Sequence, residues 1–154
     1  MRITELRRRL TEHFGAEWAP SYAKDMVLAE LGGQTIDQAL AMNPAGIAIT
    51  GKPFILAAGA DLSGITALTN ADDAKTIIKF GHDAYAKLRT SKIPTFCFVN
   101  GLALGAGTEL ALSCQYRTVA ATAFIALPEV FIGLVPGWSG VTILPKMIGP
   151  TNAV

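Results

Sequence analysis

The sequence has few charged residues and few cysteines, and both shortages exclude classes of protein. Only 16% of the 154 residues are charged and the formal net charge is +1, so no electrostatic attraction favours a nucleic-acid partner. The two cysteines, Cys97 and Cys114, lie 17 positions apart without the spacing of metal ligands. We therefore expect two buried free thiols, no metal site and no nucleic-acid partner.

The sequence also has no clear targeting or membrane segment. Its opening stretch, "MRITELRRRLTEHF", is charged throughout, unlike a signal peptide, so we expect a cytoplasmic protein. The longest apolar run covers residues 93–112, but Pro94, Asn100, Gly101 and Glu109 interrupt it. A buried strand, a tight turn and a buried helix explain this run better than a membrane span.

Half of the residues, 51%, are hydrophobic, which is enough to build the core of a globular domain. Residues 1–43 differ in composition and pattern from the rest of the chain. Residues 1–42 contain 11 charged positions, predict short amphipathic helices, the third over 35–43, and hold no cluster of potential ligands. We therefore divide the chain into a small helical segment of unknown function, 1–43, and a second domain, 44–154.

In the second domain, strand and helix patterns alternate, which predicts the α/β class with mostly parallel strands. We expect a turn at Asn100-Gly101 that continues as a loop into the next helix. The expected strands cover residues 46–50, a segment beginning at 54, 93–99 and parts of 116–127. The expected helices cover residues 71–90, part of 104–114, and 141–149.

Two glutamates stand out in this domain because it contains no others. Glu109 and Glu129 lie 20 positions apart, each among apolar and small residues. A lone glutamate is usually solvated on a helix face, but Leu110 to Leu112 follow Glu109 directly. Burial raises the pKa of a carboxyl group towards neutral pH, which suits a general acid or base. The pair is therefore a candidate catalytic site.

Two small-residue loops accompany the glutamates. The triplet "GAG" at 105–107 lies at the expected N-terminus of the helix that carries Glu109, where free N–H groups point outward. A similar opening, "AAGAD", covers residues 57–61. If the two loops face each other, they could supply two N–H donors to one oxyanion. Tight helix–strand packing is the alternative explanation of such glycines.

Residues 45–154 resemble the crotonase, or enoyl-CoA hydratase/isomerase, superfamily. The stretches that carry the resemblance are "AAGADL", "IPTFCFVNGLALGAGTELALSCQYR" and "FIALPEVFIGLVPGWSG". The sequences of these stretches are most similar to the hydratase part of multifunctional fatty-acid β-oxidation proteins. Residues 1–42 resemble a small helical bacterial domain of unknown function.

The resemblance implies a role for particular residues. It implies that Glu109 and Glu129 are catalytic and add water across the C2=C3 bond of an enoyl thioester. It implies that the amides of Ala60 and Ala106 form the oxyanion hole. It places the coenzyme A site at Ala58, Gly59, Ala60, Asp61 and Leu62. An acyl-CoA thioester is then the substrate, and no cofactor beyond its coenzyme A is needed.

The match is shorter than a complete family domain. We therefore expect a crotonase-like β-α spiral core that is incomplete at both ends, with exposed apolar edges. Intact family members are expected to form homo-oligomers. The main hypothesis is an enoyl-CoA hydratase of fatty-acid β-oxidation. Two alternatives stay open, namely an enoyl-CoA isomerase and an inactive fragment or chimera that acts at most as an interaction module.

Overall fold

The computed structural model describes residues 33–59 and 70–153. The first two expected helices of the N-terminal segment lie outside these residues. The third corresponds to α3 (Gly33–Ala41). Among the described residues, strands and helices alternate from β1 onwards, so the predicted α/β class is confirmed.

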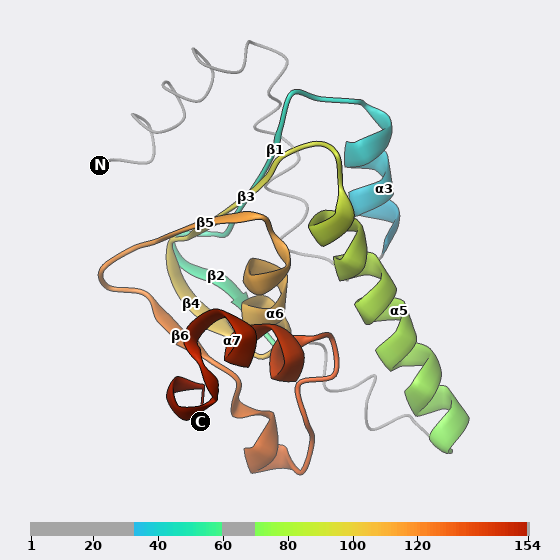
Figure 1. Cartoon of the computed structure of the whole chain (residues 1–154), viewed down its shortest axis with the longest axis vertical. Helices are drawn as coiled ribbons and strands as arrows, with labels where there is room; N and C mark the ends of the chain where they lie inside the picture. Colours follow the sequence, from blue (N-terminus) through green and yellow to red (C-terminus); the bar gives the residue numbers. More distant parts are fainter. Residues whose placement is uncertain (1–32, 60–69, 154) are drawn as a thin grey trace.

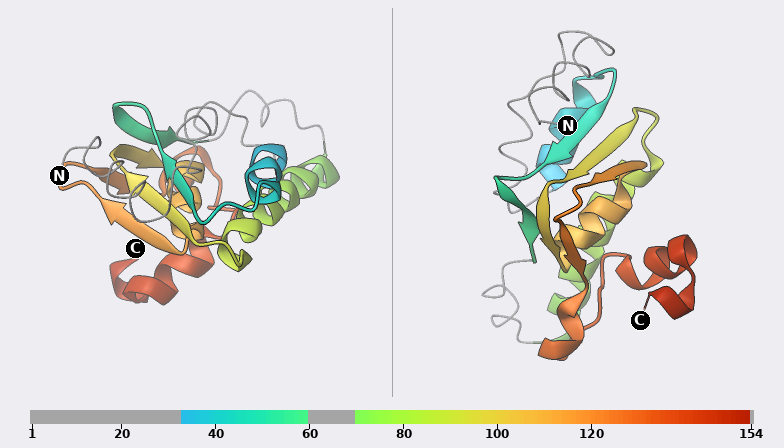
Figure 2. Two further views of the ribbon diagram at one scale, coloured as in Figure 1. Left: turned by 90° about the horizontal axis from the view of Figure 1, so that it is seen from above. Right: turned by 90° about the vertical axis from the view of Figure 1, so that its left-hand side faces the viewer.

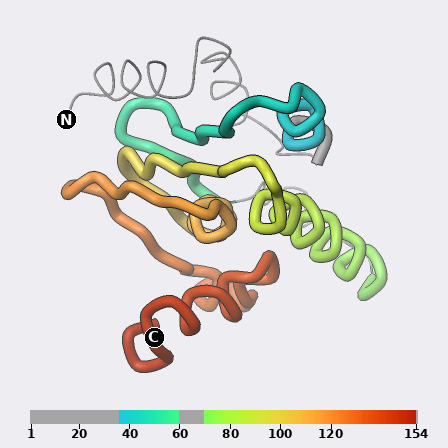
Figure 3. Tube along the Cα trace, turned by 45° about the horizontal axis from the view of Figure 1, so that its top comes forward, coloured from blue at the N-terminus to red at the C-terminus, as the bar shows by residue number. Residues whose placement is uncertain are grey.

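The strands form two three-stranded sheets, and every strand pair is parallel. The chain runs through both sheets three times in succession, and these passes stack side by side in Figure 3. The first sheet has the order β1 (Ile47–Thr50), β3 (Thr95–Val99), β5 (Tyr116–Val119). The second has the order β2 (Phe54–Ala58), β4 (Gly101–Leu104), β6 (Phe124–Ala126).

One sequence prediction was wrong at the step between the sheets. Residues 101–104 form strand β4, whereas the sequence suggested a turn and a loop. The side chain of Asn100 explains the step, because its oxygen accepts from Gly51 N at 3.2 Å and its amide donates to Lys52 O. The corner after β3 is thereby fixed to the corner after β1, and the chain resumes as a strand in the second sheet.

Helix α5 (Ala71–Thr90) has the bounds that the sequence predicted. The side chain of Asn70 caps it and accepts hydrogen bonds from Asp72 N and Asp73 N, both at 2.9 Å, which satisfies two of the free N–H groups at the start of the helix. The buried face includes Tyr85 and Leu88. The two views of Figure 2 show α5 running along one side of the sheets.

The centre of the core is helix α6 (Ala106–Ser113), whose eight residues are all buried. It lies between α5, the strands and α7 (Gly140–Ile148), as Figure 1 shows. Helix α3 adds Ile36 and Ala39 to the same hydrophobic core. Two short 3-10 helices complete the described chain, η1 (Pro128–Ile132) and η2 (Pro150–Asn152). No helix in the described part is long and apolar enough to cross a membrane.

The two cysteines are free and buried, as the sequence predicted. Cys97 lies on β3 and Cys114 follows α6. The described residues, 33–59 and 70–153, therefore form this core without a disulfide bond.

Candidate functional site

The start of helix α6 is built from the glycine triplet at 105–107. Gly105 caps the helix with φ at 54°, a left-handed angle that glycine adopts at little cost. Its amide donates to Ala126 O at 2.9 Å and so joins the helix start to β6. Ala106 is the first helical residue, and its amide therefore has no acceptor inside the helix.

The two glycines of the triplet are needed for different physical reasons. A Cβ at Gly107 would lie 2.3 Å from Ala57 O, so this glycine allows α6 to pack tightly on β2. A Cβ at Gly105 would lie 2.8 Å from Glu129 Oε1, so this glycine leaves space for a carboxyl group. The packing explanation thus holds for one glycine, and the other borders the candidate site.

The two small-residue loops lie next to each other. Ala58 pairs with Leu104 at the ends of two parallel strands, and Gly59 N donates to Leu104 O at 2.8 Å. A Cβ at Gly105 would also lie 3.7 Å from Gly59 Cα. Of the candidate coenzyme A residues, Ala58 and Gly59 are exposed, while Ala60, Asp61 and Leu62 lie outside the described residues.

Glu109 lies in the first turn of α6 and is only 3% exposed. Its Oε1 atom accepts two hydrogen bonds, from Trp138 N and Gly140 N, each 2.8 Å long. Hydrogen bonds from backbone amides to a carboxylate are among the stronger ones in proteins. The carboxylate is therefore buried against the N-terminus of α7 and held at one oxygen.

The turn that holds Glu109 is itself unusual. Ser139, between the two donors, has φ at 100° although it is not glycine. Its hydroxyl is buried and has no hydrogen-bond partner within the described structure. Strained non-glycine backbone and an unpaired buried hydroxyl both cost stability, and such strain concentrates at functional sites.

The pKa of Glu109 lies above its ordinary value of 4.5. Burial of the carboxyl group is the largest cause. The amides of Gly140 and Trp138 lower the pKa, the negative charge of Glu129 raises it, and the positive charge of Arg89 lowers it. A neighbouring like charge disfavours the charged form, so the contribution of Glu129 acts in the same direction as burial.

Glu129 lies in η1, and its carboxyl group lies next to Gly105. Its Oε2 atom is buried and makes no hydrogen bond to any described residue. A buried carboxyl oxygen is costly without a partner, and the described residues supply none for this atom. Glu129 comes three positions after the end of β6.

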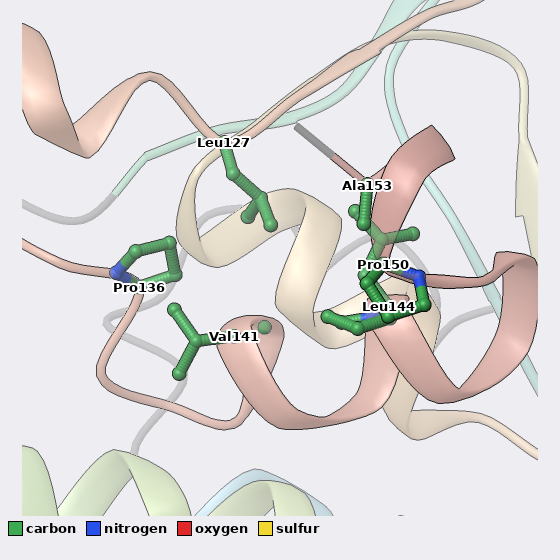
Figure 4. A pocket seen from close by; sticks show the side chains of 8 residues that line it. Leu127, Pro136, Val141, Leu144, Pro150 and Ala153 are labelled. Carbon is green, nitrogen blue, oxygen red and sulfur yellow. The ribbon is translucent and has the colours of Figure 1, made fainter.

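An apolar pocket of about 340 Å³ adjoins this region (Figure 4). Its lining includes Gly140, which also donates to Glu109, and Leu127, two positions before Glu129. Neither glutamate nor Ala106 lines it. A common cavity with both carboxyl groups on one wall and Ala60 and Ala106 on the other stays a prediction.

Sequence reasoning did not identify Trp138 and Gly140 as partners of Glu109. Within residues 128–140 it placed only Glu129 in the site. The signal that could have found them is the glycine-containing turn directly before the helix at 141–149, since such a turn presents free amides. No group of three or more potential metal ligands occurs within residues 33–59 and 70–153.

Comparison with known proteins shows the family of the chain. The model of the family "Enoyl-CoA hydratase/isomerase" matches residues 30–154, most of the chain. The chain belongs to the enoyl-CoA hydratase/isomerase family. A second model, "Protein of unknown function (DUF3046)", matches residues 1–45. The two matches overlap over residues 30–45, so the division at 43/44 stays a prediction.

Individual relatives support the family assignment. The fatty acid oxidation complex subunit alpha of Shewanella frigidimarina is 34% identical over 152 residues, which cover 97% of this chain and 20% of the relative. The enoyl-CoA hydratase from Bacillus anthracis has a TM-score of 0.70 at 28% identity and covers 79% of this chain. A Thermobifida fusca protein described as an enoyl-CoA hydratase, in complex with acetoacetyl-CoA, has a TM-score of 0.68 at 28% identity over 79% of this chain.

This chain is shorter than its relatives. It spans about one fifth of the curated relative and about half of the two solved chains, 49% and 51%. The crotonase fold predicted from the sequence is confirmed for the matched part. The likeness to a subunit of a fatty acid oxidation complex also agrees with the class of protein that the sequence resembled.

Proposed function

We propose that the chain hydrates a 2-enoyl-CoA thioester in fatty-acid β-oxidation, with Glu109 and Glu129 as the acid–base pair. The family supports this proposal, since it contains enoyl-CoA hydratases and isomerases. The named relative is a subunit of a fatty acid oxidation complex, and a solved relative binds acetoacetyl-CoA. The substrate is therefore a thioester, and coenzyme A enters as part of it.

In this reaction the two carboxyl groups share one water molecule. The oxygen of the water forms a bond to C3 while one carboxylate takes its proton, and the other carboxyl group gives a proton to C2. Negative charge develops on the thioester oxygen during the addition. Amides aimed at that oxygen stabilise the transition state by several kcal/mol, and we assign this role to Ala106 and Ala60.

The observation that carries the proposal is the environment of the two carboxyl groups. Glu109 is buried with a raised pKa, and Glu129 contributes to that rise. Glu129 in turn has a buried oxygen with no partner in the described structure. Two interacting carboxyl groups with one open oxygen suit the transfer of protons to and from a bound water. The free amide at the start of α6 lies three residues from Glu109.

The test is hydration of crotonyl-CoA by the full chain, followed as the loss of absorbance of the conjugated thioester. We expect turnover that Glu109→Gln lowers about 10²–10⁴-fold, the usual contribution of a general acid or base. Asp83→Asn is the matched control, because it makes the same chemical change at an exposed carboxylate on α5. Equal rates for all three proteins, or no turnover at all, would contradict the proposal.

The isomerase alternative is tested in the same assay. A 3-enoyl-CoA converted to the conjugated thioester without addition of water would show isomerase activity instead. An inactive interaction module would show neither reaction. Homo-oligomerisation and a cytoplasmic location also stay predictions, and gel filtration of the full chain measures the first of them.

A further inference from the structure

Tyr85 on α5 contacts both halves of the candidate site. The residue is 1% exposed, and its hydroxyl donates to Ala106 O at 3.1 Å. Ala106 is also the residue whose amide we assign to the oxyanion. The hydrogen bond of Tyr85 therefore acts on the first turn of α6, where a small rotation would move that amide.

The ring of Tyr85 also contacts the turn that holds Glu109. It meets the indole of Trp138 edge to face, with the ring centroids 5.4 Å apart and the planes at 85°. This geometry is favourable for aromatic pairs. The backbone amide of the same Trp138 donates to Glu109 Oε1 at 2.8 Å.

Helix α5 leaves space for the indole one turn before Tyr85. A Cβ at Gly81 would lie 2.1 Å from Trp138 Cε2, so any side chain at this position would collide with the indole. The indole is thus confined between Gly81 and Tyr85. The backbone amide of this confined residue is the one that donates to Glu109.

We propose that Tyr85 and Trp138 are positioning residues that couple the start of α6 to the carboxylate of Glu109. This role rests on the proposed function, because the distance between an oxyanion donor and a base matters only if both act on one substrate. Proper positioning of reacting groups is worth large factors in rate, and small displacements lose them. Neither side chain touches the substrate in this proposal.

The first test moves the indole without altering Glu109 or its donors. Gly81→Ala places a methyl group where the indole lies, although alanine favours the helix itself more than glycine does. We expect the two amide bonds to Glu109 to weaken and its pKa to rise further. Carbon NMR of isotopically labelled glutamate measures this pKa in the full chain, with Glu109→Gln to assign the signal.

The rescue variant separates a positioning role from simple damage. Gly81→Ala combined with Trp138→Phe exchanges the indole for a smaller ring beside the new methyl group, and we expect the pKa of Glu109 to return towards its original value. The other titratable groups that face Glu109 are Glu129 from η1 and Arg89 and Tyr85 from α5. All three are retained in both variants.

The second test removes only the Tyr85 hydroxyl. Tyr85→Phe leaves Ala106 O without this donor, and we expect the amide resonance of Ala106 to move. If the chain hydrates crotonyl-CoA, kcat should fall by up to about tenfold with KM unchanged, since one neutral hydrogen bond is lost. Tyr116→Phe is the matched control, because Tyr116 is 57% exposed and stacks on Phe96 instead.

The outcomes distinguish this inference from the proposed function. A Glu109 pKa that is unchanged in Gly81→Ala, or raised but not restored in the double variant, overturns the positioning role of Trp138. An unmoved Ala106 resonance in Tyr85→Phe overturns that of Tyr85. An absence of hydratase activity in the wild-type chain overturns the function alone, because the titrations and the amide resonance do not require turnover.

Discussion

The two elements that carry the glutamates differ in how they are packed. All eight residues of α6 are buried, whereas no residue of η1 is buried. In η1, Val130 is 72% exposed and Phe131 88% exposed. Each stretch carries one glutamate among small or apolar residues. Burial in this chain therefore depends on which neighbours the topology supplies, and hydrophobicity alone does not determine it.

The same contrast applies to the carboxyl groups. Glu109 is held by two amides of the turn before α7, while Glu129 keeps a buried oxygen without a partner in the described structure. One carboxyl group is thus fixed and enclosed, and the other sits on an open element. The described residues therefore satisfy the two carboxyl groups to different degrees.

The strongest test of the contrast is whether both carboxyl groups are needed. We expect Glu109→Gln and Glu129→Gln each to lower the rate of crotonyl-CoA hydration about 10²–10⁴-fold. The double variant should lose little more, because groups that act on one water fail together. Steady-state rates of the three variants measure this. A Glu129→Gln variant with full activity would mean that the enclosed half works alone.

The next largest effect is on stability. Leu110→Ala on α6, where the side chain is 2% exposed, should lower the free energy of unfolding by about 2–5 kcal/mol. Phe131→Ala on η1 should change it by no more than about 0.5 kcal/mol. Urea unfolding measures both. A large loss for Phe131→Ala that depends on protein concentration would show that another copy covers η1.

A smaller effect is expected at the strained turn. Ser139 has a φ of 100° and an unpaired hydroxyl. Glycine adopts this angle at little cost and has no hydroxyl. Ser139→Gly should therefore raise the free energy of unfolding by about 1 kcal/mol. Ser91→Gly is the matched control with the opposite sign. Its φ is −58° and its hydroxyl oxygen accepts from Ile93 N at 2.9 Å. Thermal unfolding of both variants gives the comparison, and a destabilised Ser139→Gly would show that the hydroxyl has an unseen partner.

Several parts of this arrangement could be predicted because their cause is local. The helix at 71–90 has a capping residue, Asn70, directly before it and a charged outer face. Glu109 could be placed in the first turn of a buried helix because small residues precede it and leucines follow. The glycine triplet likewise indicated a helix start with free amides.

The parts that sequence reasoning missed depend on distant contacts. Strand β4 exists because Asn100 binds the corner after β1, about 50 positions away in the sequence. Trp138 and Gly140, whose amides donate to Glu109, come 29 and 31 positions after it in the sequence, beyond η1. Ile77 and Ile78 are apolar residues on α5, yet they are 38% and 47% exposed. Periodicity shows which face is apolar, but it does not show whether a neighbour covers it.

The smallest effect, and the last test of the contrast, is the pH dependence of stability. The pKa of Glu109 is raised in the folded chain, mainly by burial, above its ordinary value of 4.5. Below that value both states are protonated and the group costs nothing. As the pH rises, the unfolded chain releases its proton first, so the free energy of unfolding falls until the folded-state pKa is passed. Glu109→Gln should remove this fall and be the more stable protein at neutral pH, although we expect it to be the slower enzyme. Asp83 should behave oppositely, because Lys79 lowers its pKa. Asp83→Asn should therefore lose a small stabilisation that the wild type has at neutral pH and that fades as the pH falls. Urea unfolding between acidic and neutral pH measures both slopes, and a Glu109→Gln variant with an unchanged slope would mean that the carboxyl group is solvated.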